Sequence, residues 1–410
     1  MSSSVAAQFS VAAATGGVTA AQGFTAAGLH CGIKAKTGAL DLGLLVAETA
    51  VPAAGIFTTN LAQAAPVTVS KRHLEAGQGL VRAIVVNSGC ANACTGAAGM
   101  SDARTMTAET AAQLGCRPEQ VLVASTGVIG VNLKMDKLVP GIRAAAGALG
   151  RDGSVMARAI MTTDPFSKEH AVTVKTARGT FTVGGTAKGS GMIEPNMATM
   201  LGFLATDAQV SPAVLQRALR QSADDTFNAI TVDGECSTND CVFAMASGQS
   251  GVEIDDELYP ALVAGFYEVS RTLAMAIVRG GEGATKLITI SVTDARSVAD
   301  ARRVAKTIAN SPLVKTAVHG ADPNWGRIVA AAGRAGVTFD VDRATVHVGG
   351  VLLFENGLPH DGNAPQAAEH LQQKDVAIDV HLGTGGGGDA TVWTCDLTAE
   401  YVKINGEYRT

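Results

Sequence analysis

Residues 188–207, K-G-S-G-M-I-E-P-N-M-A-T-M-L-G-F-L-A-T-D, place a threonine in an apolar run that is entered through glycines and a proline. If the peptide bond between Ala198 and Thr199 is cut, the α-amino group of Thr199 becomes available beside its own hydroxyl. An unperturbed α-amine has a pKa of about 7.7–8.0, so it suits general base catalysis near neutral pH. A threonine that uses its own amine as base is an established nucleophile. Thr199 in this segment would fit the role of such a self-activated nucleophile.

The residues around this bond fit such a rearrangement. Ala198 is small, Pro195 holds the residue before it extended, and Gly189 and Gly191 permit strained backbone turns. The plain alternative is that residues 197–203 form a buried strand in which the threonine faces a neighbouring element. Spacing alone favours that alternative.

Other kinds of reactive site find no support in the sequence. The stretch 184–190 has the glycine spacing of a phosphate loop, but Ser190 stands where the lysine is required. The eight histidines form no H-E-x-x-H motif, and there is no G-x-S-x-G motif. The seven cysteines lack zinc-ligand spacing. We expect neither a metal nor a bound cofactor.

Strands and helices alternate along the chain, which predicts an α/β (or α+β) fold. Two β-branched runs, 81–86 and 121–124, each end in a turn of small residues, N-S-G-C and S-T-G-V, and such turns are natural places for a site. Further strands are expected at 286–292, 344–353 and 376–382, and helices at 101–114, 211–223, 255–278 and 297–308. The four glycines 385–388 predict a flexible loop tip.

Composition limits the partners and the compartment. A chain of 410 residues with 47% hydrophobic and 17% charged residues indicates a folded protein of two or three domains. The net charge of −5 argues against nucleic acid as a partner. An odd number of scattered cysteines, no leader pattern at the N-terminus and no apolar run of 18 residues predict a cytoplasmic protein without membrane contact.

Segment 188–207 closely resembles the self-cleavage segment of the ornithine acetyltransferase family, also called glutamate N-acetyltransferase. Seven further stretches resemble family blocks in family order: 23–34, 53–60, 125–130, 161–164, 233–240, 313–328 and 396–405. Two departures stand out. Cys90 takes a position where we expect asparagine, and Glu235 with Cys236 replaces the more usual Asp-Thr. Both leave nearby substrate contacts open.

The resemblance implies a precursor that splits into an α chain (1–198) and a β chain (from 199). Thr199 would then carry an acetyl group from N2-acetylornithine to glutamate in arginine biosynthesis, by ping-pong covalent catalysis. Thr126 and Gly127 match the oxyanion-hole positions of the family. An ordinary strand-ending turn is the plain alternative for these two residues.

The resemblance also implies the substrate contacts and the architecture. Lys188 would hold a substrate carboxylate and Glu282 the ornithine ammonium, and the remaining contacts are Thr162, Thr199, Asn405 and Thr410. The fold would be an αββα sandwich domain (1–285) followed by a smaller α/β domain (286–410). The α and β chains would assemble as an α2β2 heterotetramer.

Three alternatives concern the reaction itself. Acetyl-CoA is a second donor in some members of the family, and no residue decides whether it is one here. A related amidase or aminopeptidase would use water in place of glutamate. A non-enzymatic binding protein would keep the fold and leave the chain intact.

Overall fold

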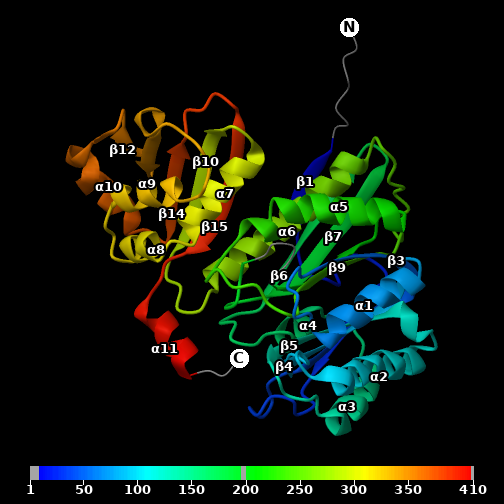
Figure 1. Cartoon of the computed structure of the whole chain (residues 1–410). Coiled ribbons are helices and arrows are strands. Elements are labelled where there is room, and N and C mark those ends of the chain that lie inside the picture. Colours follow the sequence, from blue (N-terminus) through cyan, green and yellow to red (C-terminus); the bar gives the residue numbers. More distant parts are fainter. Residues whose placement is uncertain (1–8, 195–199, 408–410) are drawn as a thin grey trace.

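The computed structural model describes residues 9–194 and 200–407, which form two β-sheets flanked by helices (Figure 1). The predicted α/β class is confirmed. The larger sheet has the strand order β1-β6-β7-β8-β9-β3-β4-β5, and β2 pairs with β3 outside this path. Its strands are β1 (Ser10–Ala14), β2 (Phe24–Leu29), β3 (Leu42–Phe57), β4 (Leu80–Cys90), β5 (Val121–Val128), β6 (Lys168–Thr176), β7 (Gly179–Lys188), β8 (Leu201–Thr206) and β9 (Cys241–Ala246).

The long strand β3 belongs to two layers. Its first half, residues 42–47, pairs with β2 and β4, whereas residues 53–57 pair with β9. The register shifts between Val46 and Val51, where the strand passes from one layer to the other. The continuous path of strands is therefore folded into two stacked sheets.

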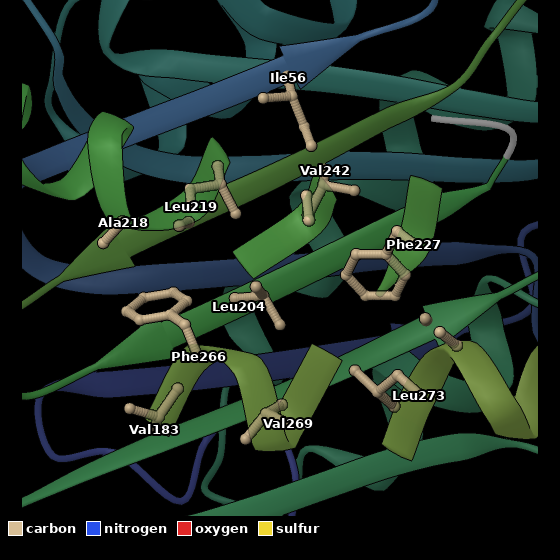
Figure 2. Close-up of a cluster of buried hydrophobic side chains, with 14 of the residues drawn as sticks. Ile56, Val183, Leu204, Ala218, Leu219, Phe227, Val242, Phe266, Val269 and Leu273 are labelled. Atoms are coloured by element: carbon tan, nitrogen blue, oxygen red, sulfur yellow. The ribbon is translucent and has the colours of Figure 1, made fainter. Parts of the chain in front are cut away.

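Alternation of side chains along the strands shows this stacking. In β8, Leu201, Phe203 and Ala205 pack in the same buried cluster as Ile84 and Leu122 of β4 and β5. Leu204 of β8 points the other way, into a cluster with the helices α5 (Pro212–Asp224) and α6 (Tyr259–Arg279). Figure 2 shows this second cluster between strands and helices. Successive side chains of a strand point to opposite faces, so both faces of this layer are covered.

Helices cover the outer face of the other layer as well. Helices α1 (Ala65–Ala76), α2 (Gly96–Leu114) and α3 (Met135–Gly147) pack against the outward side chains of β4 and β5. The order is thus helix, sheet, sheet, helix, as predicted for an αββα sandwich. The short helix α4 (Ser154–Ala159) lies beside β2 and β3.

Helix α6 is a core helix of this sandwich. Among the described residues it alone is long and apolar enough to cross a membrane, but 56% of its apolar window is buried and one face packs on β6 and β7. Long core helices commonly pass this test of length and composition. Pro260 in its first turn and Gly280 after its last residue set its ends.

A second sheet begins two residues beyond position 285. Its order is β13-β12-β11-β14-β10-β15, with strands β10 (Leu287–Ala295), β11 (Thr345–Val348), β12 (Val351–Glu355), β13 (Leu358–Pro359), β14 (Asp375–His381) and β15 (Gly388–Cys395). It carries the helices α7 (Val298–Ala309), α8 (Pro312–His319), α9 (Trp325–Gly333) and α10 (Ala364–Leu371). Figure 1 shows this unit beside the sandwich.

Two local expectations were wrong. Residues 344–353 are not one strand but a hairpin of β11 and β12, because Gly349 and Gly350 take positive φ values of 61° and 77°. The four glycines do not form a free loop tip, since the N–H groups of Gly385 and Gly387 donate to the Asp294 carboxylate. That carboxylate fixes the loop.

The last described helix, α11 (Ala399–Glu407), leaves the second sheet and returns to the sandwich. The Tyr401 hydroxyl donates to Asp233 Oδ2 at 3.3 Å. Helix α11 thereby lies beside the loop that contains Asp233, before β9.

Candidate active site

One cavity of about 140 Å³ collects the predicted site residues that the structure describes. It is lined by residues from the ends of β5 and β7, the start of β8, the loop before β9, the turn after α6, and α11. The predicted residues in its wall are Thr126, Gly127, Thr162, Lys188, Glu282 and Asn405.

Three predicted residues, Ala198, Thr199 and Thr410, lie outside the described residues. Met200, the first described residue after the predicted cut, lines the cavity, and so does Ile193 on the other side of the cut. The Cys241 N–H donates to the Met200 carbonyl at 3.1 Å, so Met200 is already joined to the sheet.

Thr126 and Gly127 lie inside an irregular stretch of the parallel β4–β5 ladder. The predicted turns N-S-G-C and S-T-G-V are extensions of the two strands, and Gly89 and Cys90 pair with Gly127 and Thr126 across a register shift. Gly127 has a φ of 128°, and a Cβ there would lie 2.4 Å from the Gly89 carbonyl carbon. Only glycine fits this crossing, which leaves backbone groups at the cavity without a side chain over them.

Lys188 is the cation of the cavity, at the end of β7. The residue is only 8% exposed, and within residues 9–194 and 200–407 its ammonium makes no hydrogen bond or ion pair. An almost buried ammonium without a partner is costly. The arrangement leaves its three donors open to an anion in the cavity.

Glu282 is an acid of the same cavity, in the turn after α6, and is likewise 8% exposed. Its Oε2 accepts a hydrogen bond of 2.8 Å from the Asn405 amide. Gly191 makes room for it, because a Cβ at that position would lie 2.4 Å from a carboxylate oxygen. The contacts among Gly191, Glu282 and Asn405 therefore depend on the residue type at each of the three positions.

Asp233 is a structural centre of the site that the sequence analysis did not single out. Its carboxylate accepts from the Met192 and Ile193 N–H groups at 2.7 and 2.8 Å, and from the Tyr401 hydroxyl. It holds the backbone that leads to the predicted cut against α11. Asp233 and Tyr401 lie within stretches 233–240 and 396–405, so the resemblance marked their surroundings but not their role.

Asp240 is a second residue that was missed. It lines the cavity at the residue before β9, is 3% exposed, and its Oδ2 has no hydrogen-bond partner among the described residues. Burial raises the pKa of this carboxyl well above its usual range, although Ser237 and Lys188 act in the opposite direction. Burial thus favours the protonated form of Asp240.

The two cysteines among the departures from the family pattern lie behind the wall. Cys90 is buried and its thiol donates to the Val131 carbonyl at 3.1 Å, while Cys236 lies 3.6 Å from the Thr58 hydroxyl. Neither lines the cavity, whereas Glu235 does. Glu235 is thus the departure that bears on a ligand directly.

Metal and phosphate-loop chemistry find no counterpart in the described residues. Across 9–194 and 200–407, no three His, Cys, Asp or Glu side chains come together in a way that would hold a metal ion. The glycines of the rejected phosphate loop, Gly184 and Gly185, lie inside β7 and pair with both neighbouring strands.

Comparison with known proteins gives consistent matches over almost the whole chain. The model of the ArgJ family matches residues 25–410. The arginine biosynthesis bifunctional protein ArgJ of Dehalococcoides mccartyi (strain CBDB1) is 49% identical over 403 residues, which cover 96% of this chain and 98% of that protein. The protein of the same name from Symbiobacterium thermophilum is 48% identical over 402 residues, with 96% and 99% covered.

A solved structure agrees with these matches. A chain from the crystal structure of the arginine biosynthesis bifunctional protein argJ of Bacillus halodurans is 41% identical, with a TM-score of 0.50. The alignment covers 51% of this chain and 100% of that chain.

Proposed function

This chain belongs to the ArgJ family, and from that premise we propose that Thr199, freed by self-cleavage, moves an acetyl group from N2-acetylornithine to glutamate. The protein is an acyltransferase of arginine biosynthesis. The observation that carries the proposed substrates is the Lys188 ammonium, which has no partner among the residues that the structure describes, in a cavity that also holds Glu282. Acetylornithine and glutamate both carry an α-carboxylate for such a cation, and ornithine adds an ammonium for the acid.

The proposed cycle conserves protons without any further group. The α-amine of Thr199 takes the hydroxyl proton as Oγ attacks the acetyl carbonyl. Thr126 and Gly127 stabilise the developing oxyanion. The C–N bond then breaks, and the ammonium returns its proton to the departing ornithine amine. Glutamate attacks the acetyl ester through its own amine, and Thr199 Oγ leaves with a proton.

The sheet order supports the proposal that the α and β chains stay together after the cut. Strands β8 and β9 would belong to the β chain, yet they lie between β7 and β3 of the α chain. Separation would break the β7–β8 and β3–β9 ladders and expose the buried clusters on both faces. The Bacillus halodurans chain, aligned in full, covers 51% of this one. The β chain would hold 212 of the 410 residues.

We further propose an α2β2 assembly in the cytoplasm, with acetyl-CoA as a second donor and no bound cofactor or metal. Seven free thiols support a reducing compartment. The word "bifunctional" in the names of the relatives supports the second donor. An assembly of twice 41.6 kDa in sedimentation experiments would support the tetramer.

A steady-state assay tests the function. Purified protein receives either N2-acetylornithine or acetyl-CoA, with and without glutamate, and N-acetylglutamate is measured. We expect product with acetylornithine and glutamate together. Release of acetate without glutamate at an equal rate would instead identify an amidase. No product with acetyl-CoA would show a single donor.

A further inference from the structure

A buried ion pair lies directly behind the cavity. Lys168 Nζ is 2.6 Å from Asp164 Oδ1, and both side chains are 0% exposed. Neither residue has a part in the acetyl transfer described above. Lys168 begins β6 and pairs with Ala187 of β7, the neighbour of Lys188. The pair thus supports the strand end that carries the cation of the cavity.

Asp164 also joins the segments that form the wall. Its Oδ2 accepts from the Thr162 N–H at 2.9 Å and its Oδ1 from the Gly189 N–H at 2.8 Å. One residue further, the Ser190 carbonyl accepts from the Glu282 N–H at 3.0 Å. The backbone around Thr162, Lys188 and Glu282 is therefore tied to one carboxylate.

The charges around this carboxylate are unequal. Burial acts to raise the pKa of Asp164, but the charges of Lys188 and Lys168 and the hydrogen bonds it accepts hold that pKa at about 2. Burial lowers the pKa of both Lys34 and Lys168, and Asp164 opposes that effect in each. Three lysines thus lie near Asp164, and for Lys34 the charge of Asp41 has a larger effect than that of Asp164. Burial raises the pKa of Asp240, a second carboxyl on which the charge of Lys188 acts.

The Asp164 carboxylate already accepts hydrogen bonds from Lys168, Thr162 and Gly189. Lys188 interacts with Asp164 by charge without a hydrogen bond, so its ammonium is neutralised from a distance and stays open. We propose that Asp164 is a positioning residue that acts as the remote counter-charge of the anion-binding side of the cavity, holding Lys188 cationic for a substrate carboxylate. This inference rests on the proposed function.

Asp164→Asn tests the inference through a pH profile. Without this negative charge, the lysines near Asp164 lose their protons more easily. The loss of carboxylate binding at alkaline pH should therefore begin at a lower pH than in the wild type. We expect the alkaline rise of KM, for acetylornithine and for glutamate, to move down by about one pH unit or more, the range for losing one nearby opposite charge. At pH values below this rise, the fold-increase in KM of the variant relative to the wild type should exceed the fold-decrease in kcat. The other titratable groups of the cavity, Asp233, Glu235, Asp240, Glu282 and Tyr401, are unchanged in this variant.

Three matched variants separate charge from structure. Asp164→Glu keeps the charge and moves the hydrogen bonds, so it should lower activity without shifting the alkaline rise. Asp207→Asn, a buried acid at the opposite end of β8, should leave the rise in place. If Asp164→Asn alone does not fold, Lys168→Met is compared with Lys168→Met/Asp164→Asn. The double variant should show the rise about one pH unit lower.

Calorimetric binding of glutamate across pH provides a readout without turnover. If the wild type binds glutamate and transfers acetyl groups but the pH profile of Asp164→Asn is not shifted, the inference is overturned. The proposed function is then left intact. A wild-type protein that neither binds glutamate nor transfers acetyl groups would overturn both. A shift of equal size in Asp207→Asn would show a general effect of lost acidic charge and would also overturn the inference.

Discussion

The amide of Asn405 donates a hydrogen bond of 2.8 Å to Oε2 of Glu282, across 123 residues of sequence. No described residue of helix α11 is buried, so the helix is held by polar contacts. Two further hydrogen bonds hold this part of the chain. The Tyr401 hydroxyl donates to Asp233, and the hydroxyl of Thr398, directly before the helix, donates to the Gly283 carbonyl. A helix with so little apolar contact depends on each hydrogen bond more than a core helix does.

Asn405→Ala should therefore weaken the binding of acetylornithine more than the binding of glutamate. Hydrogen bonds to charged groups contribute about 1.5–3 kcal/mol, which corresponds to a rise in KM of about ten- to a hundred-fold. The rise should appear in the half-reaction that binds the ornithine ammonium, because Glu282 loses its orientation. Lys403→Ala, an exposed change on the same helix, is the control and should leave KM unchanged. Equal KM values for Asn405→Ala and wild type would contradict the assignment.

Self-cleavage predicts a simple pattern on a denaturing gel. Wild-type protein should give two fragments of 198 and 212 residues, and Thr199→Ala should give one chain of 410. Under native conditions the two fragments should elute together, because β8 and β9 lie between strands of the α chain. Mass spectrometry of the β chain should begin at Thr199. A wild-type chain that remains whole would refute self-cleavage.

The oxyanion assignment predicts a loss of rate without a loss of fold. Thr126→Ala should lower kcat by about 10²–10³-fold, the usual effect of removing one such donor. Thermal unfolding should show little change. Thr180→Ala, an exposed threonine of β7 away from the cavity, controls for the loss of a strand hydroxyl. Unchanged turnover in Thr126→Ala would make Thr126 an ordinary strand residue.

Much of the cavity could be predicted because its residues lie in short, distinctive stretches. Helix starts were also legible, since Ser211 and Ser297 each accept from the N–H three residues on. Local chemistry suffices for such features. Segment 188–207 was considered as a reactive segment, with a buried strand over residues 197–203 as the alternative. Strand β8, which begins at Leu201, is compatible with both interpretations.

Long-range features had no signal in the sequence. Nothing local places Asp164 or Asp233 at the cavity, because the contacts that do so, with Gly189 and with Tyr401, span 25 and 168 residues. The passage of β3 between the two layers depends on its packing against strands on both sides. The hairpin at Gly349 depends on two consecutive glycines, and such a pair is also compatible with an irregularity inside one strand. Tertiary contacts decide these cases.

Acid should weaken the fold partly through Asp164. Its pKa is about 2 in the folded protein, below the ordinary value of 3.8, so its stabilising contribution is present above about pH 4 and is lost as the pH falls towards 2. At 1.36 kcal/mol per pKa unit this contribution is about 2 kcal/mol. In urea unfolding, the difference between wild type and Asp164→Asn should shrink by about that amount between pH 4 and pH 2. A difference that is constant with pH would contradict the depressed pKa.

Variants of Lys188 and Glu282, which differ in charge sign, should separate the half-reactions. Ornithine and glutamate share an α-carboxylate, so Lys188→Met should weaken acetyl-enzyme formation and its discharge alike, by about the 2–5 kcal/mol typical of a lost buried charge partner. Their side chains differ in sign, so Glu282→Gln should penalise formation from acetylornithine and spare discharge to glutamate, whose carboxylate a charged Glu282 repels. Single-turnover measurements of the two steps distinguish these outcomes. Lys71→Gln, a change of a lysine in α1 outside the cavity, is the control for lost positive charge. Equal losses in both steps for Glu282→Gln would mean that the carboxylate does not read the sign of the substrate side chain, and the ornithine ammonium would then have to bind elsewhere.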